Sequence, residues 1–459
     1  LLDDEDRQTV IATVRAAAVR CWISRVRLAR STLRSAVNGV TVAAIRRGVD
    51  GADEAMAGKG AKLGFAIGRC KRFLISEARN TASPRRSLLV YHFCPCPDST
   101  FSRCFSAPVA QSVVLASASL EDWRYLAFPA LHDTGDEVLV SYKRARSHAQ
   151  DAGAALELAR LEPVTGRIKE RTTLARRAEE IMQMGEWVRF PNGDLVNYID
   201  AQRPGAATTR TGLLAVRSSD RGRTFGPPER VGVIEGVEYG YAFDSIVEGP
   251  TTWMLAMTFA NLPGGKSVFP GRPMAGSVDV LRSDDSGRSW HRVRGLSHEF
   301  GDIPINESAF VRWGEGFLVT TRGYDNRQRL HLTDGDFRLI RQVDLSAADA
   351  FVQTFVGRPR LLVREGRAYL LGRNVTRPAT EKARPMQLCL LRLDVPALVA
   401  TECVVLDNAD LAPVTDGYYA MGYFRPDPSG ERFHVVTYRG RNGAAPDLMH
   451  LTFRWADVR

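Results

Sequence analysis

Residues 304–322 read PINESAFVRWGEGFLVTTR, two short apolar runs that flank a Gly-Glu-Gly turn at residues 314–316. Apolar runs of this length on either side of a glycine turn are typical of a β-hairpin. Glu307 comes at the start of the first run and Arg322 at the end of the second. Because these positions lie at the same end of an antiparallel pair, the segment predicts a hairpin that presents a carboxylate and a guanidinium at one rim.

The same strand–turn–strand pattern recurs from about Gln111 onward. Six copies with turn glycines 50 to 67 residues apart occupy residues 128–142, 186–199, 243–259, 307–322, 358–373 and 418–438. Six such units predict an all-β, six-bladed β-propeller of four-stranded antiparallel blades. One unit cannot bury both faces of its sheet alone, so the units stack around an axis. The apolar run 112–117, SVVLAS, is predicted to close the ring as the outer strand of the last blade.

Residues 1–110 differ in composition from the rest of the chain. They contain 18 Lys and Arg against nine Asp and Glu, so the net charge of +10 leaves only about +1 for the remainder. Residues 1–50 alternate Arg with apolar residues, the pattern of a basic amphipathic helix that can contact a membrane or nucleic acid. Residues 51–110 show no sustained period. We expect 1–110 to be a basic extension, partly helical or disordered, weakly folded or non-native; we assign 111–459 to the propeller and predict no nucleic-acid partner.

The sequence shows no pattern for a membrane span, a metal or a cofactor. No apolar run reaches the length of a transmembrane helix, and four acids occupy residues 3–6, where a signal peptide has a basic start. Cys94 and Cys96 form a C-x-C without a second pair at zinc spacing, and the seven cysteines do not resemble a disulfide framework. No phosphate-binding loop and no H-E-x-x-H helix occur. We therefore predict no cofactor, no metal and no integral membrane segment, and we leave the oligomeric state open.

Two segments share a more specific motif. Residues 218–225 (SSDRGRTF) and 283–290 (SDDSGRSW) both fit S-x-D-x-G-x-[TS]-[FW], and residues 333–337 (TDGDF) are a degenerate third copy. The aspartate caps a turn by accepting backbone N–H bonds, the glycine takes a conformation closed to other residues, and the aromatic packs the turn onto its blade. This motif is the Asp-box of BNR repeats. With it, residues 111–459 resemble the sialidase (neuraminidase) superfamily.

The resemblance implies an exo-acting glycoside hydrolase for an acidic glycan. Sialidases cleave a sugar that carries a carboxylate on its anomeric carbon, so a neutral tyrosine, activated by a glutamate, replaces the usual carboxylate nucleophile. Three arginines bind the substrate carboxylate through planar forks of donors, and an aspartate is the acid and base. Family habit also implies a secreted or periplasmic protein.

Carried onto this sequence, the family pattern selects eight residues. The expected catalytic residues are Glu307, Tyr419 with its neighbour Tyr418, and Asp151 in the loop SHAQDAG. The expected substrate-binding residues are Arg322, Arg358 and Arg373, with Arg124 as a candidate substitute for an arginine that the first unit lacks.

The first unit departs from the family. Sialidases read F-R-I-P where residues 126–129 read LAFP, so Ala127 stands at the position of the first arginine. Arg124, Lys143 or Arg144 are the candidate replacements. The change leaves open whether sialic acid is the substrate.

Two other functions remain open for the same propeller. One is a lyase or hydrolase for uronate-containing glycans, in which His148 or His132 moves protons together with Tyr418 or Tyr419. The other is a non-catalytic propeller that binds glycan or protein through its rim. The linkage cleaved and the stereochemical outcome do not follow from the sequence.

Overall fold

The computed structural model describes residues 102–205, 209–258, 277–348, 351–375 and 386–459. The chain divides into two units, Leu1–Val90 and Tyr91–Arg459. The first unit lies outside the described residues, so the prediction of a basic helical or disordered extension is untested. Among the described residues, no helix combines the length and the apolar character that a membrane span requires.

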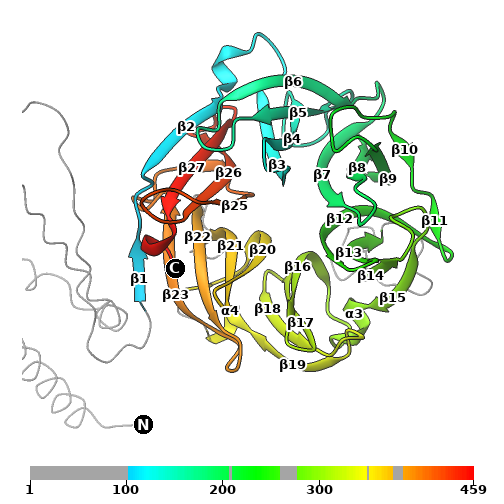
Figure 1. Ribbon diagram of the computed structural model, residues 1–459, viewed down its shortest axis with the longest axis vertical. Helices are drawn as coiled ribbons and strands as arrows, with labels where there is room; N and C mark the ends of the chain where they lie inside the picture. Colours follow the sequence, from blue (N-terminus) through cyan, green and yellow to red (C-terminus); the bar gives the residue numbers. More distant parts are fainter. Residues whose placement is uncertain (1–101, 206–208, 259–276, 349–350, 376–385) are drawn as a thin grey trace, which may run out of the picture. The chain divides into compact units, whose positions relative to one another are not determined.

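Six antiparallel sheets surround a central axis, which confirms the predicted six-bladed propeller (Figure 1). In blades 1 to 3 the strands follow chain order from the inner to the outer edge: β3 (Tyr125–Asp133), β4 (Val138–Ala145), β5 (Ala155–Leu161), β6 (Ile168–Ala175); β7 (Ile181–Arg189), β8 (Leu195–Arg203), β9 (Thr209–Ser218), β10 (Glu229–Arg230); and β12 (Val237–Glu248), β13 (Thr251–Thr258), β14 (Val278–Ser283), β15 (His291–Gly295). Blades 4 to 6 repeat this order: β16 (Ile305–Trp313), β17 (Gly316–Gly323), β18 (Gln328–Thr333), β19 (Leu339–Asp344); β20 (Val356–Arg364), β21 (Arg367–Val375), β22 (Met386–Asp394), β23 (Val399–Asp407); and β24 (Val414–Gly417) with β25 (Met421–Arg425), β26 (Arg432–Arg441), β27 (Asp447–Arg454).

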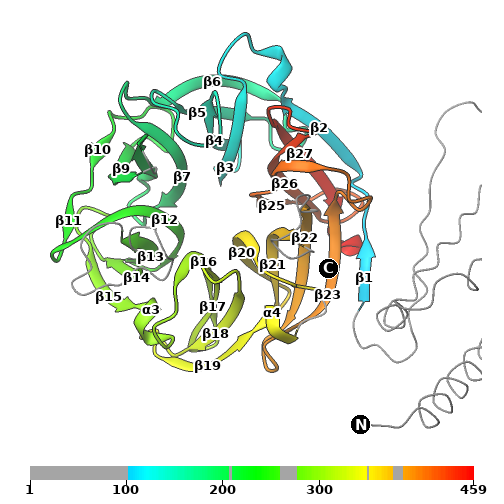
Figure 2. The same cartoon turned by 180° about the vertical axis from the view of Figure 1, so that it is seen from behind.

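Segments from outside the regular order add strands to three blades. Strand β2 (Ala110–Leu115) pairs antiparallel with β27, so the predicted closure of the ring by the first apolar run is confirmed. Strand β1 (Ser102–Phe105) pairs parallel with β23 and covers the outer edge of blade 5 (Figure 2). The propeller therefore extends at least to Ser102, ahead of the predicted boundary at residue 111. Strand β11 (Val233–Ile234) adds a fifth strand to blade 3, and in blade 6 the inner edge is divided between β24 and β25.

The two S-x-D-x-G turns adopt the same hydrogen-bonded structure. Asp220 accepts the backbone N–H of Thr224 at 2.9 Å and its hydroxyl at 2.6 Å, while the Ser218 hydroxyl accepts the N–H of Gly222 at 2.8 Å. The second turn repeats these bonds through Ser283, Asp285, Gly287 and Ser289. The turn chemistry predicted from the sequence is therefore present in both places.

Each of these turns packs against the preceding blade. Gly287 has a φ of +74°, and a Cβ there would lie 2.2 Å from the ring of Phe190 in blade 2. Arg217 of blade 2 donates to the carbonyls of Ser286 and Gly287 at 3.1 and 3.3 Å. The glycine thus permits both the backbone conformation and the close approach of two blades.

Candidate active site

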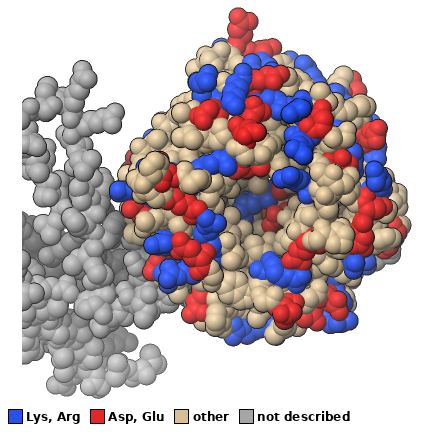
Figure 3. Space-filling view, viewed as in Figure 1, with Lys and Arg blue, Asp and Glu red and all other residues tan. Residues whose placement is uncertain are grey.

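A polar cavity of about 200 Å³ lies at the axis of the propeller. The lining residues come from blades 1, 2, 3, 4 and 6 and their loops: Phe128, His148, Gln183, Met184, Asp200, Gln202, Arg210, Tyr241, Asn306, Glu307, Arg322, Tyr324 and Tyr419. In the space-filling view the ring is hollowed at its centre, and charged side chains are visible inside the depression (Figure 3).

The inner strands lose their regular pairing where they reach this cavity. The register shifts between Ala127 and Ala130 in β3, between Met182 and Met184 in β7, and between Ile305 and Ser308 in β16. Similar shifts occur in β12 and β20. A bulge interrupts the alternation of side chains along a strand and redirects the side chain at the bulge. Phe128, Gln183 and Glu307 all lie at such bulges and line the cavity.

Glu307 and Arg322 meet as the hairpin predicts. Arg322 Nη1 lies 2.5 Å from Glu307 Oε2, which also accepts the backbone N–H of Arg358 at 2.9 Å. The hydroxyl of Tyr241 lies 3.4 Å from Oε1. Burial by itself would raise the pKa of Glu307, but Arg322 and the bonds from Tyr419 and Arg358 outweigh it and hold the pKa at about 2. Glu307 is therefore a carboxylate over the whole neutral range.

Tyr419 is the tyrosine that faces this ion pair. Its hydroxyl accepts from Arg322 Nη1 and from Arg373 Nη2, each at 3.3 Å, and the Arg373 guanidinium stacks 4.6 Å from the ring centre. Burial and the Glu307 charge raise the pKa of Tyr419, while Arg373 and Arg322 oppose that shift. A phenolate at this position would be stabilised by two guanidiniums.

Tyr418, the other candidate, is placed elsewhere. Its φ is +68°, its ring packs in the core, and its hydroxyl donates to Asp407 at 3.0 Å. Its left-handed backbone turns the Tyr418 side chain into the core, so of the two tyrosines only Tyr419 lines the cavity.

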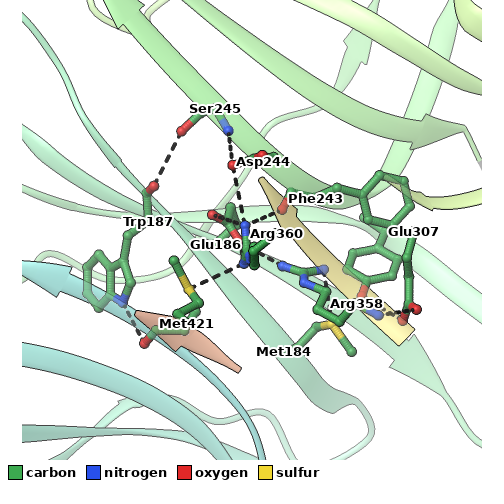
Figure 4. Close-up of polar contacts among 12 residues, drawn as sticks. Met184, Glu186, Trp187, Phe243, Asp244, Ser245, Glu307, Arg358, Arg360 and Met421 are labelled. Carbon is green, nitrogen blue, oxygen red and sulfur yellow. Dashed lines mark hydrogen bonds and ion pairs between the residues drawn. The ribbon is translucent and has the colours of Figure 1, made fainter. Parts of the chain in front are cut away.

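Arg358 does not line the cavity, because its guanidinium is engaged in a buried ion pair. The guanidiniums of Arg358 and Arg360, from β20 of blade 5, converge on the Glu186 carboxylate, from β7 of blade 2 (Figure 4). Arg358 Nη2 lies 2.6 Å from Glu186 Oε2, and the side chains of all three residues are at most 6% exposed. Arg360 also donates to the carbonyl of Phe243 at 2.8 Å. A buried ion-pair cluster therefore joins opposite blades across the axis, and it includes an arginine expected to bind substrate.

Asp151 and Arg124 do not line the cavity either. Asp151 is 6% exposed, and its carboxylate accepts the backbone N–H groups of Arg146 and Ser147, so it holds its own loop together. Arg124 is exposed and donates to the carbonyl of Leu120 at 2.6 Å. The residue of the 146–151 loop that does line the cavity is His148.

The arginine absent at Ala127 has no direct replacement in blade 1. Lys143, which pairs with Ala127 in the sheet, is buried with its amine 2.7 Å from Gln183 Oε1. Burial lowers the pKa of Lys143 to about 8, although nearby carboxylates oppose the shift. Arg144 forms an ion pair with Asp122 at 3.3 Å. Neither basic side chain lines the cavity.

Blade 2 contributes a cation that the sequence motifs do not indicate. Arg210 of β9 lines the cavity, with its Nε 3.2 Å from Asp200 of β8. Asp200 also accepts from Gln202 at 2.7 Å. These residues belong to no motif, and only their convergence on the axis identifies them. Among the described residues, the His, Cys, Asp and Glu side chains form no group that could hold a metal ion.

Comparisons with known proteins find likeness in structure only. Neither a protein-family model nor a curated protein matches the sequence. A Dyadobacter fermentans protein of unknown function aligns with a TM-score of 0.56 at 14% identity, over 75% of this chain and 98% of that one. The K499G mutant of the NanB sialidase of Streptococcus pneumoniae aligns with a TM-score of 0.51 at 8% identity, over 73% of this chain and 69% of that one. Trypanosoma rangeli sialidase has a TM-score of 0.48 at 10% identity, over 73% of this chain and only 55% of that enzyme. The likeness to NanB, at 8% identity, shows that this chain has a sialidase-like propeller fold.

Proposed function

We propose that this chain is a sialidase-like glycoside hydrolase that acts at the end of an acidic glycan, with Tyr419 as nucleophile. The observation that supports this best is the convergence of Glu307, Arg322 and Tyr419 at the axial cavity, with Arg373 packed against Tyr419. These residues come from blades 4, 5 and 6, and each contacts at least one of the others.

The electrostatics suit an anionic substrate. A sugar carboxylate next to the reacting carbon would repel a carboxylate nucleophile, whereas a tyrosine hydroxyl approaches it uncharged. Two guanidiniums already contact the Tyr419 oxygen, so the negative charge that develops there on proton loss is stabilised. Glu307 is the acceptor for that proton.

Substrate binding would also raise the basicity of Glu307. In the free protein Arg322 is the main group that lowers the Glu307 pKa, and a carboxylate with a pKa of about 2 is a weak base. A substrate carboxylate that binds Arg322 would offset this positive charge, so the Glu307 pKa rises when the base is needed. Arg322 Nη1 and Arg373 Nη2 already reach the Tyr419 hydroxyl, so these two guanidiniums are the groups we expect to bind such a carboxylate.

The experiment is turnover of a fluorogenic α-sialoside by the full chain. We expect Tyr419→Phe and Glu307→Gln to lower kcat by about 10³-fold or more, because each removes a group that acts only in the transition state. Tyr418→Phe is the matched variant, since it removes the neighbouring hydroxyl outside the cavity and should keep most of the activity. No release by folded wild-type protein, or equal loss in both tyrosine variants, would overturn the proposal.

One observation favours a second substrate class. His148 and Tyr419 line the same cavity, and a histidine with a tyrosine can remove and deliver the protons of a uronate lyase. If the sialoside is inert, uronate-containing oligosaccharides are the next substrates, and a lyase would reveal itself by the absorbance of the unsaturated product.

A further inference from the structure

The geometry points to His148 as the proton donor to the leaving group, with Asp416 as its positioning residue. This inference rests on the proposed hydrolase and replaces Asp151 in the role of acid and base. It assigns a histidine–aspartate pair to a step for which the sequence pattern suggested a carboxyl group.

The contacts of His148 leave one ring nitrogen for a ligand. Nδ1 lies 2.6 Å from Asp416 Oδ2 and 2.8 Å from the hydroxyl of Tyr125. The side chain is 57% exposed and lines the cavity together with Tyr419. Both polar contacts are made by Nδ1, so Nε2 is the nitrogen that faces a substrate.

Asp416 determines which nitrogen carries the proton. Burial would raise the pKa of Asp416, but the bonds from His148 and Tyr125 outweigh burial and keep the pKa below its ordinary value. Tyr438 adds a third bond to the carboxylate at 3.0 Å. A carboxylate is an acceptor only, so Nδ1 of His148 holds a proton. Nε2 therefore accepts a proton when the ring is neutral and donates one when it is charged.

The surroundings hold the imidazole in place before a substrate arrives. The backbone carbonyl of His148 accepts from Lys143 Nζ at 2.8 Å and from Gln183 Nε2 at 3.2 Å. The ring packs edge-on against Phe128, with 5.1 Å between centres. Because these contacts hold both the backbone and the ring of His148, the imidazole loses little conformational freedom when it reacts. The charged groups that face it are Asp416 and the buried Lys143 and Asp151 beside its loop.

The other ionisable groups of the cavity are already engaged. Glu307 is paired with Arg322 and acts on Tyr419, and Asp200 is paired with Arg210 and bonded to Gln202. His148 is the lining group in the described part of the chain that combines a carboxylate partner with an available nitrogen. His148 lies in a loop of blade 1 and Glu307 in blade 4, on the opposite side of the ring, so the two residues can serve separate proton transfers.

In both steps of the proposed hydrolysis, each proton that is released passes to a named group, and each bond broken at the anomeric carbon is replaced by a new one. Nε2–H of the His148 imidazolium passes its proton to the glycosidic oxygen as the bond from that oxygen to the anomeric carbon breaks. Tyr419 passes its own proton to Glu307 and bonds to the same carbon, and the alcohol departs. The neutral imidazole then takes a proton from water, whose oxygen bonds to the anomeric carbon as the bond to Tyr419 breaks. Tyr419 recovers its proton from Glu307, and His148 is again charged.

The test compares leaving groups in the full chain. For His148→Gln we expect kcat to fall by about 10²–10⁴-fold on an alkyl α-sialoside, whose leaving alcohol needs a proton, and by less than about tenfold on a 4-nitrophenyl α-sialoside. His298→Gln is the matched control, because His298 also pairs with an aspartate, Asp302, at 2.8 Å but is 88% exposed and does not line the cavity.

The outcomes separate the two proposals. If wild type hydrolyses both sialosides but His148→Gln loses the same factor on each, or none, His148 is not the acid and the hydrolase stands. If folded wild type hydrolyses neither, the hydrolase fails and the acid role fails with it. Nitrogen NMR tests the pair without turnover: neutral His148 should carry its proton on Nδ1 in wild type and shift toward Nε2–H in Asp416→Asn. A neutral wild-type ring protonated on Nε2 would overturn the inference.

Discussion

Replacement of Glu186 by glutamine tests the buried ion-pair cluster that joins blades 2 and 5. The Glu186 carboxylate, 3% exposed, accepts from Arg358 Nη2 at 2.6 Å and from Arg360 Nη1 and Nη2 at 3.0 and 2.5 Å. Glutamine has nearly the shape of glutamate but no negative charge. The buried guanidiniums of Arg358 and Arg360 would then have too little negative charge nearby to balance them. Loss of one partner of a buried pair costs about 3–5 kcal/mol. For the unit Tyr91–Arg459, an unfolding entropy of about 2.1 cal/mol/K per residue converts this cost to a fall in Tm of about 4–6 °C.

Tryptophan fluorescence during thermal and urea unfolding of the full chain measures this loss. The control is Glu248→Gln, which breaks the paired contacts with Arg312 on half-exposed side chains, 31% and 40% exposed, and should cost at most about 1 kcal/mol. A Tm within about 1 °C of wild type for Glu186→Gln, or equal shifts in both variants, would refute the reasoning. Because Arg358 also donates its N–H to Glu307, we expect the same variant to lower turnover by the proposed hydrolase.

Three further predictions concern pH and packing. The pKa of Glu307 is about 2 in the folded protein against an ordinary 4.5, so the stability that its charge contributes is complete above pH 4.5 and is lost as the pH falls to 2. The free energy of unfolding, measured over this pH range, should therefore fall less in Glu307→Gln than in wild type, by on the order of 3 kcal/mol. Burial lowers the pKa of His331 to about 3, so the unfolded chain takes the proton first, and stability should fall from pH 6.5 toward 3 less steeply in His331→Gln than in wild type. Gly287→Ala should lower the free energy of unfolding by more than about 2 kcal/mol, since its Cβ would meet Phe190 at 2.2 Å, whereas Gly193→Ala, also at positive φ but with open space around it, should cost about 1 kcal/mol in urea unfolding.

The repeat pattern is enough to predict the architecture from the sequence. Strand alternation and turn chemistry act between residues close in the chain, so the six units, the hairpin at 304–322 and the two capped turns can be recognised from local patterns alone. The pairing of Glu307 with Arg322 follows for the same reason, because hairpin register places both at one end of a sheet. The strand ahead of the first unit, β2, is also predictable, since a ring needs an outer strand for its last blade.

The tertiary structure decides which of the other candidates reach the axis. Whether Tyr418 or Tyr419 faces the cavity, and whether Asp151 or His148 does, depends on bends and loop contacts at single residues, which no repeat reports. Arg358 pairs with Glu186, and Arg210 lines the cavity, only because ring closure brings blades distant in sequence together. Local patterns determine how each blade folds, but the charges that meet at the centre depend on the register shifts of inner strands and on how six blades close around one axis.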